Sequence, residues 1–337
     1  MKLLVIRFSS IGDIVLTTPV LRCLKHQRKG ISIHYLTKLS YKDVVAANPH
    51  IDKVHYLEDN INAVIENLKG EQFDEIIDLH NNLRTMRIKK ALKVRSYAFP
   101  KLNIQKWLLV NLKINLMPDK SIVERYLDTV KHLEVYNDGK GLDYFIPDNV
   151  KLADNDIPMS HWAGFVGCVI GGSYNTKKLP VDKWKDICLQ SPYPVILLGG
   201  PEDREFGDMI AANDKLKIYN SCGKFSLNES ARLVQLAKVV VSNDTGLMHI
   251  AAAFNKTIVS FWGNTSPEMG MFPYFGFNNV NDRRTNKSIV IENKKLYCHP
   301  CSKIGYNHCP EGHFRCMSDL NISKLPTHIV TIWNANN

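Results

Sequence analysis

Residues 238–254, which read KVVVSNDTGLMHIAAAF, decide the fold that this sequence predicts. An apolar run leads into a polar turn with one glycine, and a run of small helix formers follows. The segment therefore predicts a strand, a tight turn and a helix. The N-terminus of such a helix points free backbone N–H groups at the space above the strand end, where they suit a phosphate.

The side chains of this turn fit the same purpose. Gly246 leaves room for close approach, and Asp244 and Thr245 are residues that cap helices. His249 lies in the first turn of the expected helix and faces the same ligand. On these residues alone, an ordinary capped helix with a buried histidine remains the alternative.

A second strand, turn and helix open the chain. Residues 1–8 read MKLLVIRF, SSIGD follows at positions 9–13, and an apolar run continues. Asp13 places a carboxylate at this turn, beside Arg7 and Ser10. The dinucleotide pattern G-x-G-x-x-G is absent, and a simple role for Asp13 at the helix N-terminus is the alternative. Two such turns, far apart in sequence, suggest two α/β units that face one cleft.

At these turns the chain resembles glycosyltransferase family 9, the ADP-heptose:lipopolysaccharide heptosyltransferases. Arg-x-Ser-Ser-x-Gly-Asp at residues 7–13 looks like the start of that family, and residues 223–267 resemble its C-terminal core. The resemblance implies an α/β fold of the GT-B architecture, with two Rossmann-like parallel-sheet domains facing a cleft. It also implies inverting transfer of heptose, or a related sugar, from ADP-heptose to a lipopolysaccharide core acceptor.

The length and composition agree with a two-domain globular enzyme. The chain has 337 residues, of which 45% are hydrophobic and 23% charged, enough for two domains. No stretch approaches the ~20 apolar residues of a membrane span, and Arg7 interrupts the first apolar run, which favours a strand over a signal peptide. We therefore expect a cytoplasmic protein whose eight cysteines are mostly reduced.

The formal net charge of +10 is concentrated in one segment. Between Asp78 and Asp119 the chain has no acidic residue but nine basic ones, interleaved with apolar side chains: Arg84, Arg87, Lys89, Lys90, Lys93, Arg95, Lys101, Lys106 and Lys113. Such a surface suits anionic lipid head groups or a phosphorylated acceptor; nucleic acid and a solvated helix face are the alternatives. The resemblance favours the lipid, because the family's acceptor is a phosphorylated glycolipid at the inner membrane surface, and implies peripheral association.

Alternating strand-like and helix-like segments predict parallel sheets with helices on both faces. A polar stretch at 139–159, with two prolines, is interpreted as a linker. It separates an acceptor-binding domain, residues 1–150, from a nucleotide-sugar-binding domain, residues 160–325. The resemblance further suggests that a final helix, 326–337, returns to the first domain. The expected strands are 2–8, 31–37, 53–57, 75–79, 165–170, 195–198, 217–219, 238–242 and 257–262.

Two more loops follow strands of the second domain, at the edge where open parallel sheets bind ligands. Residues 171–180 read GGSYNTKKLP and offer backbone, the hydroxyls of Ser173 and Thr176, and ammonium groups for a diphosphate. The Lys-x-Leu-Pro spacing resembles the family's Lys-x-Trp-Pro, so Lys177 matches the family's sugar-nucleotide lysine. A surface turn is the alternative.

The other loop, residues 199–205, reads GGPEDRE. A carboxylate after a strand accepts hydrogen bonds from ribose or sugar hydroxyls, and the family has an acidic residue here. Glu202 is preferred to Asp203 for this role. Both carboxylates equally suit the cap of the next helix.

This layout predicts a mechanism. Lys177, the amides at Thr245 and Gly246, and the helix dipole stabilise the leaving diphosphate. Asp13 takes the proton from the acceptor hydroxyl as it attacks the anomeric carbon, which inverts that carbon. No Asp-x-Asp metal pair stands at either turn, so no cofactor is expected to be required.

Acceptor contacts are expected on the first domain. Arg7 and Ser10 position Asp13 or bind an acceptor phosphate. Arg84 belongs to a segment after Asp78 that resembles the family's Asp-x-x-x-Asn-x-Arg, and it is expected to contact the acceptor phosphate. A helix cap in this segment is the alternative.

Metal binding by a cysteine-rich segment, and two alternative functions of the protein, are further hypotheses. Cys298, Cys301, Cys309 and Cys316 have a spacing that fits a structural zinc in a reduced compartment, although buried reduced thiols or disulfides explain them equally well. With the basic segment, a zinc module would suit a nucleic-acid-binding protein. A sugar-nucleotide epimerase of the GT-B fold is the third hypothesis.

Overall fold

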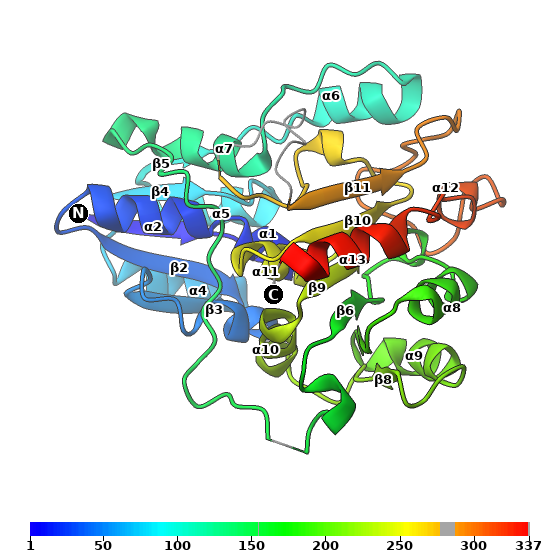
Figure 1. The fold of residues 1–337 in the computed structure, drawn as a ribbon. Helices are drawn as coiled ribbons and strands as arrows, with labels where there is room; N and C mark the ends of the chain where they lie inside the picture. The colour runs from blue at the N-terminus through cyan, green and yellow to red at the C-terminus, as the bar shows by residue number, and fades with distance from the viewer. Residues whose placement is uncertain (154, 277–286, 336–337) are drawn as a thin grey trace.

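The computed structural model describes residues 1–153, 155–276 and 287–335, and it contains two parallel sheets side by side (Figure 1). The first sheet has the order β3-β2-β1-β4-β5, and every pairing in it is parallel. Its strands are β1 (Lys2–Ile6), β2 (Ser32–Lys38), β3 (Lys53–Leu57), β4 (Glu75–Asp78) and β5 (Arg95–Ala98).

The second sheet has the order β11-β10-β9-β6-β7-β8 and is also parallel. The predicted α/β class with two parallel-sheet units is therefore confirmed. Its strands are β6 (Val166–Val169), β7 (Val195–Leu198), β8 (Ile218–Asn220), β9 (Val239–Asn243), β10 (Ile258–Trp262) and β11 (Ser288–Glu292).

Helices connect the strands of each sheet, as parallel pairing requires. Those of the first half are α1 (Ile11–Val15), α2 (Thr18–Gln27), α3 (Lys42–Val45), α4 (Ile61–Lys69), α5 (Leu83–Leu92), α6 (Asn103–Trp107) and α7 (Ile122–Leu127). Those of the second half are α8 (Val181–Gln190), α9 (Arg204–Ala211), α10 (Leu227–Leu236), α11 (Gly246–Ala253), α12 (Arg315–Ser318) and α13 (Leu325–Ala335). In the part of the chain that the structure describes, no helix is long and apolar enough to cross a membrane.

Local sequence explains where these elements begin. Central strands such as β4 and β9 are buried along their whole length, which fits strands covered on both faces. Pro19 lies in the first turn of α2, so the helix expected from Asp13 begins anew there, because proline is tolerated only in the first turn. Ser226 and Glu229 form a capping box that starts α10.

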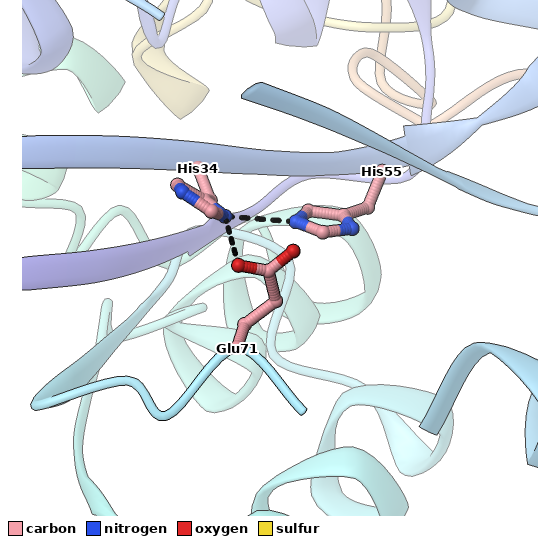
Figure 2. Close-up of side chains that lie close together, drawn as sticks. All are labelled: His34, His55 and Glu71. Atoms are coloured by element: carbon pink, nitrogen blue, oxygen red, sulfur yellow. Dashed lines mark hydrogen bonds and ion pairs between the residues drawn. The ribbon is translucent and has the colours of Figure 1, made fainter. Parts of the chain in front are cut away.

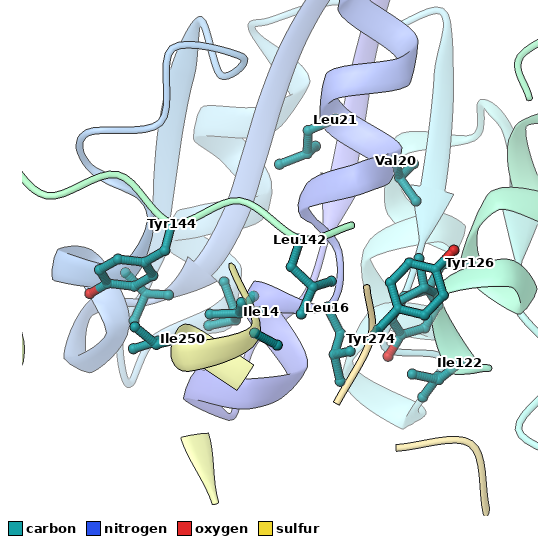
Figure 3. Close-up of a cluster of buried hydrophobic side chains, with 14 of the residues drawn as sticks. Ile14, Leu16, Val20, Leu21, Ile122, Tyr126, Leu142, Tyr144, Ile250 and Tyr274 are labelled. Atoms are coloured by element: carbon teal, nitrogen blue, oxygen red, sulfur yellow. The ribbon is translucent and has the colours of Figure 1, made fainter. Parts of the chain in front are cut away.

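The two halves share one apolar cluster (Figure 3). Ile14 of α1 and Ile250 of α11 lie in it, and Tyr144 of the connecting segment packs beside them. The Tyr144 hydroxyl donates to Asn228 Oδ1 at 2.8 Å. Because this cluster lies where α1 and α11 meet, it fixes the two helix N-termini opposite each other.

Two edge strands and the last helix differ from expectation. Neither β5 nor β11 was expected. The β5 sequence RSYA lacks an apolar run, and the SIVIE sequence of β11 has only three apolar residues in a row. The C-terminal helix does not return to the first domain. Its buried residues join a cluster of second-half residues, and Trp333 stacks on Tyr193 with ring centroids 3.8 Å apart. Its last expected residues, 336–337, lie outside the described residues.

Candidate active site

A cavity of about 500 Å³ lies between the two sheets and is lined from both halves of the chain. The first half contributes the turn after β1 and the start of α1, and the second contributes loops after β6, β9 and β10. Nine of the residues predicted for the site line it: Arg7, Ser10, Asp13, Ser173, Lys177, Asp244, Thr245, Gly246 and His249. The sequence prediction that the two turns face one cleft is therefore confirmed.

Asp13 stands at the centre of the first-half wall. Arg7 Nη2 lies 2.5 Å from Asp13 Oδ1, and the Ser10 hydroxyl donates to Asp13 Oδ2 at 2.8 Å. Arg7 is itself held by the Leu79 carbonyl at 2.6 Å and the Tyr126 hydroxyl at 3.0 Å. A rigid, buried guanidinium thus orients the carboxylate.

Burial acts to raise the pKa of Asp13, but the Arg7 charge and the hydrogen bonds from Ser10 outweigh it and lower that pKa. Asp13 is therefore ionised at neutral pH, the state that a general base requires. One oxygen faces Arg7 and the other faces Ser10, so the geometry holds the carboxylate charged at the cavity wall.

The second-half wall is built from a different pair of charges. Lys177 Nζ lies 2.6 Å from Asp244 Oδ2, and the Thr265 hydroxyl donates to the same oxygen at 3.0 Å. Helix α11 begins at Gly246, directly after this aspartate, with Thr245 as its extended N-cap. An ammonium group and a helix N-terminus therefore meet at one point of the cavity, which suits an anion.

His249 lies in the first turn of α11 and is only 2% exposed. Burial lowers its pKa to about 4, so the ring is neutral. Its Nδ1 has no hydrogen-bond partner among the described residues. The ring lines the cavity, so a neutral imidazole forms part of its wall.

Two glycines let the helix N-termini of α1 and α11 touch. A Cβ on Gly12 would lie 2.5 Å from His249 Cδ2, and a Cβ on Gly246 would lie 2.8 Å from Ile11 Cβ. Both distances are shorter than real Cβ contacts. The close approach of the halves therefore depends on the missing side chains.

A second cavity of about 310 Å³ shares Ser10, Gly12, Ser173, Thr245 and Gly246 with the first. Apolar side chains and glycine-rich backbone from the loops after β6 and β7 line the rest of it. A site of this kind suits the flat face of a base or a sugar ring. The two cavities therefore adjoin at the N-terminus of α11.

The two candidate carboxylates of the loop after β7 have different surroundings. Asp203 is buried, lies 2.6 Å from Lys178 Nζ and accepts from the Gly200 amide at 3.0 Å. It therefore holds the loop together. Glu202 is exposed and lines the second cavity, where its carboxylate is available to a ligand.

Two predicted residues take other positions. Thr176 is buried, and its hydroxyl donates to the Tyr306 carbonyl at 2.9 Å and accepts from the Tyr306 amide at 2.8 Å. It does not line the central cavity and instead fixes the loop that carries Lys177. Arg84 is exposed and lines a separate hollow of about 770 Å³ with Lys38 and Arg87.

Three lysines that sequence reasoning did not place at the site also line the cavity: Lys101, Lys106 and Lys303. Burial, with the nearby Arg125 charge, lowers the pKa of Lys106 to about 8. Burial also lowers the pKa of Lys101. The acid-free basic segment was visible in the sequence, but nothing in its pattern distinguished the two inward lysines from the exposed ones.

The cysteine-rich segment does not form a preassembled metal site. All four cysteines are free thiols. Among the described residues, no three of the thiols have sulfur atoms within 4.8 Å of one another. Cys298 Sγ instead lies 3.8 Å from His313 Nε2. The geometry gives no support to the zinc module that the spacing suggested.

Comparison with known proteins gives a consistent result. The family model of glycosyltransferase family 9 (heptosyltransferase) matches residues 61–305. The chain is 24% identical over 292 residues to lipopolysaccharide heptosyltransferase 1 of Campylobacter coli, which covers 79% of this chain and 84% of the relative. It is 25% identical to lipooligosaccharide heptosyltransferase 2 of Haemophilus influenzae, with 80% and 85% covered.

Solved structures agree on the fold. A glycosyltransferase family 9 protein from Veillonella parvula superposes with a TM-score of 0.74 at 19% identity, covering 99% of this chain and 97% of that one. ADP-heptose lps heptosyltransferase II of E. coli gives 0.69 at 18% identity, with 99% of both chains covered. The match to the family model across most of the chain shows that this chain belongs to glycosyltransferase family 9 and is a glycosyltransferase.

Proposed function

We propose that this enzyme transfers heptose, or a related sugar, from ADP-heptose to a lipopolysaccharide core acceptor, with inversion at the anomeric carbon. Its curated relatives carry the names of lipopolysaccharide and lipooligosaccharide heptosyltransferases. The observation that carries the proposal is the shared cavity, where the Asp13 carboxylate faces Lys177 and the N-terminus of α11.

The donor is proposed to lie across the two adjoining cavities at the N-terminus of α11. Its diphosphate binds at Lys177 and the amides of Thr245 and Gly246, where the helix dipole adds to the ammonium charge. The adenosine occupies the second cavity, with Glu202 accepting hydrogen bonds from ribose hydroxyls. Solved E. coli heptosyltransferases of the same fold contain ADP or ADP-2-deoxy-2-fluoro heptose.

Chemistry follows from the two walls. The acceptor hydroxyl approaches from the first half and gives its proton to Asp13 as its oxygen attacks the anomeric carbon. The bond to the diphosphate breaks on the opposite face, and Lys177 with the α11 amides stabilises the charge that develops there. These cationic groups make a divalent ion unnecessary for leaving-group departure, so no cofactor is proposed. A structural zinc at the cysteines remains a prediction that requires the loop to draw the thiols together.

The acceptor is proposed to be anionic at the point of transfer. Lys101, Lys106 and Lys303 line the same cavity as Asp13. Together with Arg7 they supply positive charge for acceptor phosphate or carboxylate groups. Arg84 stays a predicted phosphate contact, farther out beside Lys38 and Arg87.

The inner membrane surface is the proposed partner for the segment around α6, which projects from the upper edge of the molecule in Figure 1. Large apolar side chains there are exposed: Ile104 by 73%, Trp107 by 54% and Leu116 by 60%. Exposed cations of the same basic segment, such as Lys93 and Arg95, precede them in the chain. Apolar side chains among lysines suit peripheral binding to anionic lipid.

A donor-binding assay tests this function. Thermal unfolding is measured with ADP, ADP-heptose, and UDP and GDP sugars, since a ligand that binds the folded state raises the midpoint. We expect stabilisation by ADP and ADP-heptose alone, and release of ADP when a lipopolysaccharide core acceptor is added. Stabilisation by UDP sugars alone would contradict the donor assignment.

A further inference from the structure

A second group of titratable side chains lies outside the cavity, at the first sheet. His34 of β2 and His55 of β3 project from neighbouring strands toward Glu71, which lies in the loop after α4 (Figure 2). His34 Nδ1 lies 2.9 Å from His55 Nε2 and 3.7 Å from Glu71 Oε2. One ligand atom from each residue fits within 4.8 Å of the others, so three potential metal ligands converge.

Packing holds the two rings in this arrangement. His34 is buried, and Phe73 stands edge-on to both rings, with centroid distances of 5.2 Å and 6.2 Å. Leu36 of β2 is the register partner of His55, so the two histidines lie on the same face of adjacent strands. Burial lowers the pKa of both rings, that of His55 to about 4, and neutral imidazole is the form that binds a metal.

We propose that His34, His55 and Glu71 bind a divalent transition-metal ion such as Zn²⁺. Two imidazole nitrogens and one carboxylate oxygen are a ligand set typical of zinc, and water supplies the open position. Zinc–nitrogen bonds of about 2.0–2.1 Å place the two nitrogens ~3.4 Å apart in a tetrahedral site. The rings therefore need to separate by only about half an ångström. The ion takes the place of the proton between the two nitrogens, and that proton moves to the other nitrogen of the ring that carried it.

Two lysines compete with the ion for the carboxylate. Lys2 Nζ lies 3.3 Å from Glu71 Oε2, and Lys53 Nζ contacts Oε1. The Lys53 side chain is 56% exposed, so it can swing into solvent when a cation arrives. Lys2 also donates to the Glu71 carbonyl at 2.7 Å, and it holds the loop in place from behind.

The site is separate from catalysis. His34 is paired with Leu4 in the middle of β1, whereas Asp13 lies beyond the end of that strand. Neither histidine nor Glu71 lines the central cavity. A bound ion would tie the edge strand β3 and the Glu71 loop to β2, so it would raise thermal stability and leave sugar transfer unchanged.

Metal titration of the tag-free, full-length protein tests the proposal after treatment with a chelator. Co²⁺ is the spectroscopic probe, and Zn²⁺ affinity is measured by its displacement. The expected wild-type result is one Co²⁺ per chain with weak visible bands and no intense thiolate charge-transfer band, which would instead indicate the cysteine segment. Zn²⁺ is also expected to raise the unfolding midpoint.

Three variants and one control make the test specific. His55→Gln and Glu71→Gln should each weaken binding by more than ~100-fold, beyond the effect typical of residues outside the ligand shell. Lys53→Gln should tighten it about two- to fivefold, the range expected for removing one exposed competing ion pair. His26→Gln, which changes an exposed histidine of α2, should leave binding unchanged.

Tighter Co²⁺ binding in Lys53→Gln distinguishes a metal site from a triad with only a structural role. In a structural triad, removal of Lys53 would not increase metal affinity. Equal Co²⁺ affinity in wild type and His55→Gln, or a thiolate spectrum, would overturn the proposal. Circular dichroism of each variant establishes that it is folded, so loss of binding is not loss of structure.

Discussion

The two walls of the cavity contain the same kind of ion pair, and we propose that the two pairs act on opposite ends of the reaction. In Arg7–Asp13 the cation is buried and held by protein groups, and the carboxylate lines the cavity, where it is the proposed base. In Lys177–Asp244 the carboxylate is buried and held by Thr265, and the ammonium group is the one proposed to bind the ligand. In this proposal the group that is fixed by additional hydrogen bonds orients its partner, and the partner performs the chemistry.

The largest expected effect comes from the first wall. Asp13→Asn keeps the shape but removes the base, so we expect kcat to fall by about 10²–10⁴-fold, the usual contribution of general base catalysis. The affinity for ADP should stay within about twofold of wild type, because Asp13 does not carry the proposed diphosphate site. Steady-state transfer assays and ADP titration measure the two quantities. Wild-type turnover in Asp13→Asn would show that Asp13 is not the general base.

Removing the cation of the second wall should weaken donor binding as well as turnover. Lys177→Gln removes charge opposite the leaving diphosphate, and we expect a loss of about 10²–10³-fold in kcat, as for a single group that stabilises transition-state charge. ADP binding should weaken too. Lys185→Gln, at a half-buried position of α8 where the side chain pairs with Asp182, is the matched control. Unchanged ADP affinity in Lys177→Gln would mean that the diphosphate lies elsewhere.

A steric change tests whether the two walls must touch. Gly246→Ala places a methyl group 2.8 Å from Ile11 Cβ, and overpacking of this kind costs about 1–3 kcal/mol. We expect transfer to fall by roughly tenfold or more, with ADP binding retained, because the halves would be held apart. Gly70→Ala is the control, because Gly70 has an ordinary φ and its nearest contact lies at 3.6 Å. Gly30 has open space around it but a positive φ, so alanine there would strain the backbone. Full activity of Gly246→Ala would show that catalysis tolerates a wider separation.

Most features of the two walls could be predicted from the sequence. Both strand–turn–helix segments, and the residues Asp13, Lys177 and Asp244, were predicted from turn chemistry and family resemblance. The central strands were predicted because they are buried, apolar and short. The edge strand β5 lacks that pattern, and β11 has a three-residue apolar run but is only partly buried.

Other features depend on tertiary placement, which local sequence does not encode. The inward direction of Lys101 and Lys106 depends on how the segment around α6 folds over the cavity, and Lys303 comes from a loop remote in sequence. The docking of α13 on the second sheet is decided by where an apolar face finds a partner. The His34–His55–Glu71 group is assembled from two strands and a loop with no shared motif.

The pH dependence of acceptor binding tests whether Lys106 contacts the acceptor. The pKa of Lys106 is lowered to about 8, so its ammonium form is present below pH 8 and is lost as the pH rises through that value. If it binds an acceptor anion, the acceptor KM should be constant below about pH 7 and rise severalfold by pH 9. In Lys106→Arg the rise should disappear, since a guanidinium stays charged. An identical pH profile in both proteins would exclude this role.

At the outer surface we expect an effect on membrane binding and none on the chemical step. Replacing Ile104 and Trp107 with serine removes exposed apolar area beside the cations and should weaken binding to anionic vesicles by about tenfold, with transfer to a detergent-free, short-chain acceptor unchanged. Vesicle flotation with and without anionic lipid measures this. Equal flotation of the variant and wild type would remove the segment around α6 from the membrane contact.

A crystal structure with the unreactive donor ADP-2-deoxy-2-fluoro heptose would show where the donor lies. We expect the diphosphate at Lys177 and the amides of Thr245 and Gly246, with the anomeric carbon turned toward Asp13 across the shared cavity. A diphosphate bound away from the α11 N-terminus, or a sugar that points out of the cavity with Asp13 facing no open space beside it, would overturn both proposed roles.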